Sequence, residues 1–170
     1  MKLKSVGLIL ALSLLGVVQT NAQPRPQSKA CDANAVALNL APLSNKVRAE
    51  IVAAVARTLS DSAPDRRTAR NIALNSWASY PRLSRTDATV VVTAGPDNPN
   101  NGLSNRQIWV FRIVGHHAEL LLEDWSLMCD FDPASYHKGM VDLHLRTNNS
   151  GANDSVTIFQ FDGKQYHALK

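Results

Sequence analysis

The sequence predicts an α+β fold in which one or two N-terminal helices pack on an antiparallel sheet of about five to six strands. Two observations indicate this fold. Apolar residues recur at four-residue spacing between residues 44 and 59, which is typical of an amphipathic helix. From residue 88 onward, short runs rich in β-branched and aromatic residues alternate with turn-forming segments, which is typical of strands joined by short connections.

The first 22 residues have the three parts of an export signal. Lys2 and Lys4 form a basic start, an apolar run of 13 residues follows, and small residues precede a cleavage site between Ala22 and Gln23. The apolar run is shorter than the roughly 20 residues of a membrane-spanning helix, so an uncleaved anchor is the less favoured alternative. We therefore expect an exported protein, either periplasmic or extracellular.

The cleavage site also defines the expected domain organisation. We expect a signal peptide over residues 1–22, a leader segment over residues 23–43 and a single α+β domain over residues 44–170, with no membrane span after signal removal. Loss of Lys2 and Lys4 leaves sixteen basic and fourteen acidic residues, so the net charge falls from +4 to +2. So small an excess of positive charge disfavours nucleic acid as a partner.

The remaining charge is unevenly divided along the chain. Residues 46–87 carry eight basic and four acidic side chains, whereas residues 88–170 carry six and nine. This division predicts a basic helical part and an acidic sheet part. Two solvated faces of opposite charge are the simplest interpretation.

The two cysteines, Cys31 and Cys129, predict one disulfide. An even number of cysteines in an exported protein favours pairing, which would join the start of the mature chain to the strand region. A bridge across so long a loop stabilises the fold by roughly 4–5 kcal/mol in the chain-entropy model. Two buried thiols and a metal pair are the alternatives. No histidine stands at metal-ligand spacing from either cysteine, which disfavours the metal.

The helical signals lie between residues 44 and 79. Ser44 or Asn45 can cap the first helix. The apolar residues that form its stripe are Val47, Ile51, Val55 and Leu59. The segment Asp61-Ser62-Ala63-Pro64 ends this helix, and a second, shorter helix is expected from about Asp65 to Ser79.

The strand signals begin at residue 88. The stretch from Gln107 to Asp124 predicts a central β-hairpin, because two runs of strand character flank Gly115-His116-His117. Residues 132–138 and 148–154 are predicted loops, since turn-forming residues dominate them. Asp162-Gly163 predicts a tight two-residue hairpin connection near the end of the chain. The predicted strands are residues 88–94, 107–114, 118–124, 140–146, 156–161 and 164–169, and residues 125–131 are expected to continue or bend from the second strand of the hairpin.

A family resemblance rests on four of these motifs. The chain resembles the C-terminal part of small exported bacterial proteins of unknown function in the motifs IWVFR, LLL after the turn, GMVDLHL and VTIFQFDGKQY. In those proteins the pattern marks a strand meander similar to a single blade of the integrin-like FG-GAP or VCBS repeat. The resemblance covers roughly Ala88 to Leu169 and implies a fold without an activity. Related repeats often bind calcium through an acidic loop, but the corresponding residues 83–88 hold one carboxylate, so we expect no calcium site.

His144 and Asp142 are the candidate catalytic residues. They lie two residues apart on one predicted strand, so their side chains share a face with Arg146. A carboxylate beside a histidine can orient the imidazole for general-base catalysis. The alternative, which we favour, is a solvated outer sheet face whose charges pair across strands.

Asp130, Asp132 and His137 are the candidate metal ligands. They stand close together in the sequence near Cys129, but two carboxylates are few for a hard cation. His116 and His117 are neighbours at the hairpin tip and would point to opposite sides of an extended chain, which disfavours chelation. No nucleophile, zinc or phosphate-binding motif occurs in the chain. We therefore expect no metal and no cofactor.

The function most consistent with these features is an exported, non-enzymatic module that binds a protein or a cell-envelope component through its loops. The alternative is a small enzyme or ligand-binding protein with a pocket between helix and sheet that uses His144 and Asp142. A purely structural accessory domain is a third class. An envelope or extracellular protein is the expected partner, and no sequence feature indicates an oligomeric state.

Overall fold

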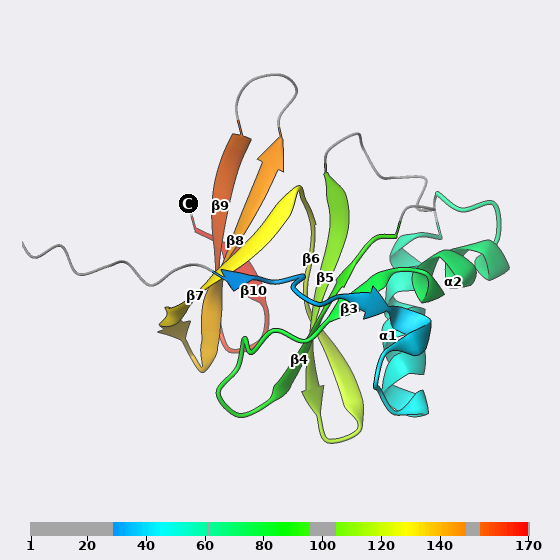
Figure 1. Cartoon of the computed structure of the whole chain (residues 1–170), viewed down its shortest axis with the longest axis horizontal. Coiled ribbons are helices and arrows are strands. Elements are labelled where there is room, and N and C mark those ends of the chain that lie inside the picture. The colour runs from blue at the N-terminus through cyan, green and yellow to red at the C-terminus, as the bar shows by residue number, and fades with distance from the viewer. Residues whose placement is uncertain (1–28, 61, 96–104, 149–153, 170) are drawn as a thin grey trace, which may run out of the picture.

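The computed structural model describes residues 29–60, 62–95, 105–148 and 154–169. In this part of the chain, two helices and ten strands form three layers (Figure 1). The helices cover one face of a five-stranded antiparallel sheet, and a second five-stranded antiparallel sheet covers the other face. The predicted α+β class is confirmed, although its strands divide between two sheets. The expected signal peptide, residues 1–22, lies outside the described residues.

The two helices begin where the sequence predicts. Helix α1 (Asn45–Thr58) is capped by Ser44, whose hydroxyl accepts a hydrogen bond from the Val47 amide at 3.3 Å. Helix α2 (Arg66–Leu74) is capped by the Asp65 carboxylate, which accepts from the Thr68 amide at 2.7 Å. All four residues of the predicted α1 stripe are buried.

The predicted end of the second helix is wrong. Helix α2 ends at Leu74, and Trp77–Ser79 form strand β3 instead. Pro81 disfavours a helical conformation for the residue before it. The backbone of β3 pairs with residues 91–93 of the next strand, so sheet hydrogen bonds replace those of a continued helix.

The first sheet contains the predicted central hairpin. Its strands, in spatial order, are β2 (Val36–Ala37), β3, β4 (Ala88–Thr93), β5 (Arg106–Val114) and β6 (His117–Ser126). The hairpin β5–β6 turns at Gly115 and His116, and Gly115 has a φ of 60°, which favours glycine. Both faces of β5 are buried. Trp109 and Phe111 pack against the helices, whereas Ile108 and Val110 face the second sheet.

The chain crosses from the first sheet to the second at Ser126 and Leu127. The Ser126 hydroxyl donates to the carbonyl oxygens of Met128 and Arg146, and the Leu127 amide donates to the Arg146 carbonyl at 2.7 Å. These bonds hold the bend between β6 and the next strand, so one continuous extended segment contributes to both layers.

The second sheet contains most of the C-terminal strand signals. Its strands, in spatial order, are β1 (Lys29–Ala30), β7 (Met128–His137), β8 (Met140–Asn148), β9 (Asp154–Phe161) and β10 (Tyr166–Ala168). The connection from β9 to β10 has four residues where two are predicted. The Asp162 carboxylate explains the difference, because it accepts hydrogen bonds from the amides of Gln165 and Lys164 and closes a wider turn. These two bonds are the main reason that the pKa of Asp162 falls to about 2.

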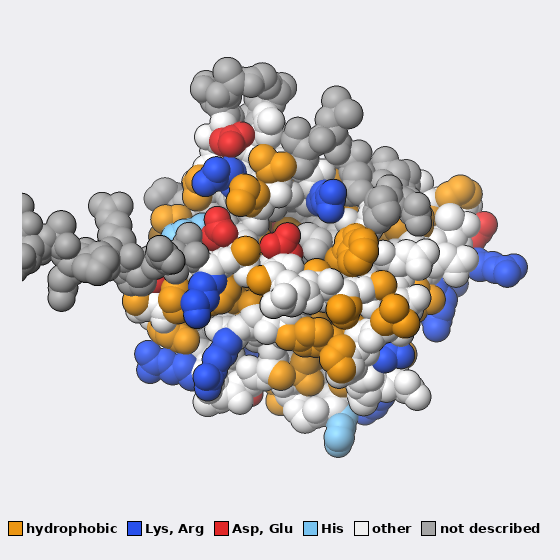
Figure 2. All heavy atoms as spheres, in the orientation of Figure 1, with side chains coloured by type: hydrophobic (Ala, Val, Ile, Leu, Met, Phe, Trp, Pro, Cys, Tyr) orange, Lys and Arg blue, Asp and Glu red, His pale blue; other side chains and the backbone are white. Residues whose placement is uncertain are grey.

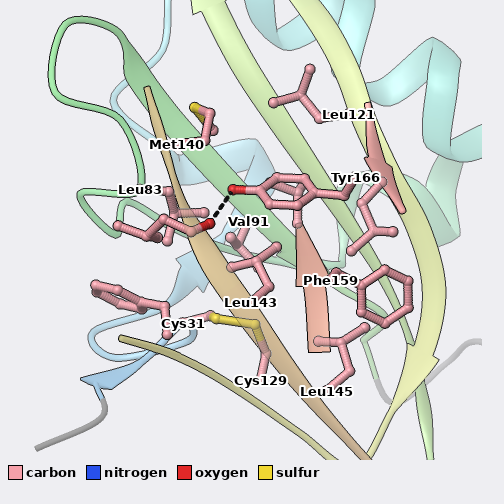
Figure 3. Packing of buried hydrophobic residues seen from close by; sticks show 14 of the residues in the cluster. Cys31, Leu83, Val91, Leu121, Cys129, Met140, Leu143, Leu145, Phe159 and Tyr166 are labelled. Atoms are coloured by element: carbon pink, nitrogen blue, oxygen red, sulfur yellow. Dashed lines mark hydrogen bonds between the residues drawn. A yellow bond between two sulfur atoms is a disulfide. The ribbon is translucent and has the colours of Figure 1, made fainter. Parts of the chain in front are cut away.

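A hydrophobic core fills the space between the two sheets (Figure 3). The predicted disulfide between Cys31 and Cys129 is confirmed and lies in this core, with the two Cα atoms 5.3 Å apart. The Tyr166 hydroxyl donates to the Val141 carbonyl at 2.9 Å. Burial, reinforced by the nearby Asp142 carboxylate, raises the pKa of Tyr166.

The described part of the expected leader segment, residues 29–43, contributes to both sheets. Its strands β1 and β2 each pair at a sheet edge, and Leu38 is fully buried against the helices. The Ser79 hydroxyl donates to the Cys31 carbonyl at 2.6 Å, which links the segment to β3. No helix among the described residues is long and apolar enough to span a membrane.

Candidate functional site

A bulge in β7 accompanies a hydrogen-bonded polar cluster on the second sheet. The pairing between β7 and β8 runs up to Phe131 opposite Leu143 and resumes at Tyr136 opposite Val141. Four residues of β7 therefore stand opposite the single residue Asp142. Pro133 lies within the bulge and has no amide to donate to a neighbouring strand. The segment predicted as a loop is thus a strand with a bulge at its proline.

Three side chains, two of them from β7, converge on the Asp142 carboxylate, which is buried. Ser135 donates its hydroxyl to Oδ2 at 2.6 Å, and the Nδ1 atom of His137 lies 2.5 Å from Oδ1. The Gln160 amide nitrogen, from β9, lies 3.2 Å from Oδ2 and 3.2 Å from Nε2 of His137. The cluster therefore joins β7, β8 and β9 through one carboxylate.

The hydrogen bonds keep Asp142 ionised. Burial by itself raises the pKa of this carboxyl, but the bonds from Ser135, His137 and Gln160 together outweigh it, so the pKa of Asp142 lies below its ordinary value. Because Gln160 donates to Nε2 of His137, the proton of the neutral imidazole resides on Nδ1 and points to Asp142.

The arrangement differs from that of a nucleophilic triad. In such a triad a serine donates to the histidine, which in turn donates to the carboxylate. Here Ser135 and His137 both donate to Asp142, and Nε2 of His137, the atom that would take a proton, is already bonded to Gln160. The geometry favours a structural role that holds the bulge in place.

The predicted partnership of His144 with Asp142 is not present as a hydrogen bond. Among the described residues, the side chains that donate to the Asp142 carboxylate are Ser135, His137 and Gln160. His144 lies on the same outward face, in register with Asp130 on one side and Ile158 on the other. The histidine that meets Asp142 is therefore His137, which the bulge brings to it.

The predicted metal ligands are also separated by the bulge. The Asp132 carboxylate accepts from the Ala134 amide at 2.8 Å within the bulge, whereas His137 faces Asp142. Asp130 lies in the regular part of β7, opposite His144. No group of three or more His, Cys, Asp or Glu side chains in the described ranges is placed to hold one metal ion.

An open groove lies beside this cluster, where three distant stretches of the chain meet. The groove has a volume of about 490 Å³. It is bounded by residues 29–34, by residues 80–82 after β3, and by β7. We refer to it as the aromatic groove, because Tyr80, Phe131 and Tyr136 line it together with Pro81 and Pro133. Lys29 and Arg82 also line it, and none of the described lining residues is acidic.

The aromatic rings of the groove differ in exposure. Phe131 is buried and forms the floor, whereas Tyr80 is 40 % exposed. The Arg85 guanidinium carbon lies 4.2 Å from the centre of the Tyr136 ring, a cation–π contact that holds this ring in position. Hydrophobic side chains gather on the neighbouring surface over β2 and β3 (Figure 2), where Trp77 is 39 % exposed.

Sequence reasoning does not find this groove. Tyr80, Phe131 and Tyr136 are separated by 51 and 5 residues and belong to segments of different predicted type. The sequence signal is a proline close to an aromatic residue at two places, Tyr80-Pro81 and Pro133 near Tyr136. These places form one site because the disulfide and β1 bring residues 29–34 beside β7.

The described residues therefore define a class of protein: an α+β domain of two stacked sheets with a basic, aromatic-lined groove near its disulfide. Comparisons of the chain with protein-family models, with curated proteins and with solved structures find no match.

Proposed function

We propose that the protein is an exported, non-enzymatic module that binds a protein or a cell-envelope component, and that it does so in the aromatic groove. The observation that carries the proposal is the partly exposed Tyr80 and Tyr136 above a buried Phe131 floor. Tyrosine and arginine are enriched among residues that dominate binding energy at protein interfaces.

The shape of the groove favours an extended polypeptide as the ligand. Aromatic-lined grooves with prolines recognise extended segments, whose side chains enter between the rings. The groove also runs along β1, a two-residue strand at the edge of its sheet. An edge strand offers backbone groups to an added strand. With Lys29 and Arg82 in the lining, a segment that carries acidic residues fits best.

Two features support the exported part of this proposal. A disulfide between Cys31 and Cys129 is typical of proteins from oxidising compartments, and the start of the sequence has the pattern of a signal peptide. The intact disulfide supports β1, which forms one wall of the groove.

The proposal is tested by selection of random peptides on the purified, oxidised protein. We expect enriched peptides that bind the wild-type protein and that lose affinity by about tenfold or more for Tyr80→Ala and Tyr136→Ala. Ile158→Ser is the matched control, because Ile158 is exposed on β9, which β8 separates from β7, and does not line the groove. Thermal unfolding of each variant verifies that it is folded.

A parallel measurement uses purified cell-wall polysaccharide in a co-sedimentation assay. Binding that depends on Tyr80 would identify an envelope component as the ligand, because aromatic rings also stack on sugar rings. If neither peptides nor polysaccharide bind, or if the two tyrosine variants bind as well as Ile158→Ser does, the proposed function is wrong.

A further inference from the structure

A second groove lies between α1 and α2 and shares no lining residue with the aromatic groove. It encloses a volume of about 410 Å³. Its floor consists of small apolar side chains, among them Ala53 and Ala56 from α1 and Ala69 from α2. Alanine side chains on facing helices leave space that larger residues would fill, so the sequence itself keeps this groove open.

Three arginines border the alanine floor. Arg57 belongs to the last turn of α1, and Arg66 and Arg70 lie one turn apart on α2. All three side chains belong to exposed residues, and several Lys and Arg side chains border this helical end of the molecule (Figure 2). None of the described residues that line the groove is acidic.

The described carboxylates of α1 and of the α2 cap are engaged elsewhere. Asp65 accepts the Thr68 amide as the cap of α2. Glu50 accepts the Ala118 amide at 2.8 Å and faces His117 across the interface with the hairpin. Within the described ranges, none of the three arginines forms an ion pair with a carboxylate.

The positive charge of Arg66 stands at an unfavourable position, the N-terminus of a helix. It is the first residue of α2, where the helix dipole presents its positive end, and the one described carboxylate at this end, that of the Asp65 cap, accepts from the Thr68 amide. Arg70, four residues later, adds a like charge at a spacing that destabilises a helix. Arg57 has an ordinary explanation, because a cation in the last turn of a helix is favourable. Among the described residues, nothing of this kind accounts for Arg66 and Arg70.

We propose that this groove, the arginine groove, binds a small anionic amphiphile: a phosphate or carboxylate group joined to an apolar part. Guanidinium groups recognise both anions with paired hydrogen bonds. The anion would offset the repulsion among the three arginines, and the apolar part would lie on Ala53, Ala56 and Ala69. The volume lies within the range of small-molecule sites.

The test measures binding of octyl phosphate to the oxidised protein by calorimetry, below the concentration at which the ligand forms micelles. Octyl glucoside has the same chain without the charge, and inorganic phosphate has the charge without the chain. We expect each of these to bind at least about tenfold more weakly than octyl phosphate, since both halves of the groove are needed. Equal binding of octyl glucoside, or no binding of octyl phosphate, overturns the proposal.

Matched variants of α2 locate the site. Arg66→Gln and Arg70→Gln should each weaken octyl phosphate binding by about tenfold. Arg67→Gln is the control, because Arg67 carries the same charge on the same helix but does not line the groove. Ala53→Leu should also weaken binding by filling the floor. If Arg67→Gln weakens binding as much as Arg66→Gln does, the attraction is unspecific and the proposal is wrong.

A lipid headgroup has the same chemistry as the proposed ligand, so vesicles of phosphatidylglycerol form a separate arm. A small-ligand site predicts that the protein binds monomeric octyl phosphate and does not sediment with these vesicles. Sedimentation with vesicles in the absence of binding to monomeric octyl phosphate would assign the surface to a membrane and overturn the small-molecule site. All of these variants leave the aromatic groove intact, so failure here leaves the peptide-binding proposal untouched.

Discussion

The Nδ1 atom of His117 lies 3.0 Å from Oε1 of Glu50, which joins the start of β6 to helix α1. Lys46 Nζ lies 3.1 Å from Nε2 of the same ring, and the Ala118 amide donates to the other oxygen of Glu50. The hairpin tip, predicted as a solvated turn, therefore has one histidine in the turn, His116, and one that contacts the helix layer.

This relationship predicts different effects for two adjacent substitutions. His117→Ala removes the contact with Glu50 and should lower Tm by roughly 1–3 °C, as expected for the loss of an exposed pair. His116→Ala should leave Tm unchanged within error, since surface substitutions have small effects. Thermal unfolding at neutral pH measures both variants. Equal Tm values for the two would show that the contact contributes nothing.

The Asp142 cluster predicts a pH-dependent contribution to stability. The pKa of Asp142 in the folded protein lies below its ordinary value, so its carboxylate stabilises the fold at pH values above about 4. This stabilisation is lost as the pH falls through the lower pKa of the folded state. Asp142→Asn should therefore cost about 1–3 kcal/mol at pH 7 and progressively less at acidic pH.

The control for Asp142 is Asp130→Asn, because Asp130 lies in the same sheet outside the hydrogen-bonded cluster. Chemical denaturation over a series of pH values measures both variants. A loss of stability in Asp142→Asn that stays constant down to pH 2 would contradict the role assigned to the ionised carboxylate.

Trp109 and Phe111 predict the largest single-residue losses of stability. Both side chains are buried between the first sheet and the helices, and the Trp109 indole donates to the Thr58 hydroxyl at 3.2 Å. Trp109→Ala or Phe111→Ala should lower the free energy of unfolding by about 3–5 kcal/mol. The whole free energy of unfolding of a domain is typically about 5–15 kcal/mol. Val156→Ala, at a residue 54 % exposed, should cost less than about 0.5 kcal/mol. Urea unfolding would contradict the assignment if all three variants had the same midpoint.

The disulfide predicts a stability difference that depends on oxidation. Replacement of both Cys31 and Cys129 by alanine should cost about 2–5 kcal/mol, because the bridge closes a loop with a sequence separation of 98 residues. A reducing agent should destabilise the wild-type protein to a similar extent and leave the double variant unchanged. Two freely alkylated thiols in the oxidised, folded protein would show that the pairing is absent.

Within the candidate sites, the sequence predicts only those relationships that join residues close together along the chain. The shared face of Asp142 and His144 follows from strand alternation and is present in the structure. The meeting of Asp142 with His137 requires four residues of β7 to stand opposite one residue of β8. No period in the sequence specifies that bulge, although Pro133 is a sign of it.

The sequence by itself determined the α+β class, the start and buried stripe of α1, the central hairpin and the cysteine pair. Each of these depends on local periodicity, capping or a count of residues, which act over a few positions. Only the tertiary structure decided that the strands divide into two sheets, because the bend at Ser126 and Leu127 places β7 to β10 over the face of β5 that holds Ile108 and Val110. A continuous apolar run such as residues 108–111 is compatible with burial on both faces, but which segments cover the second face depends on residues far away in the chain.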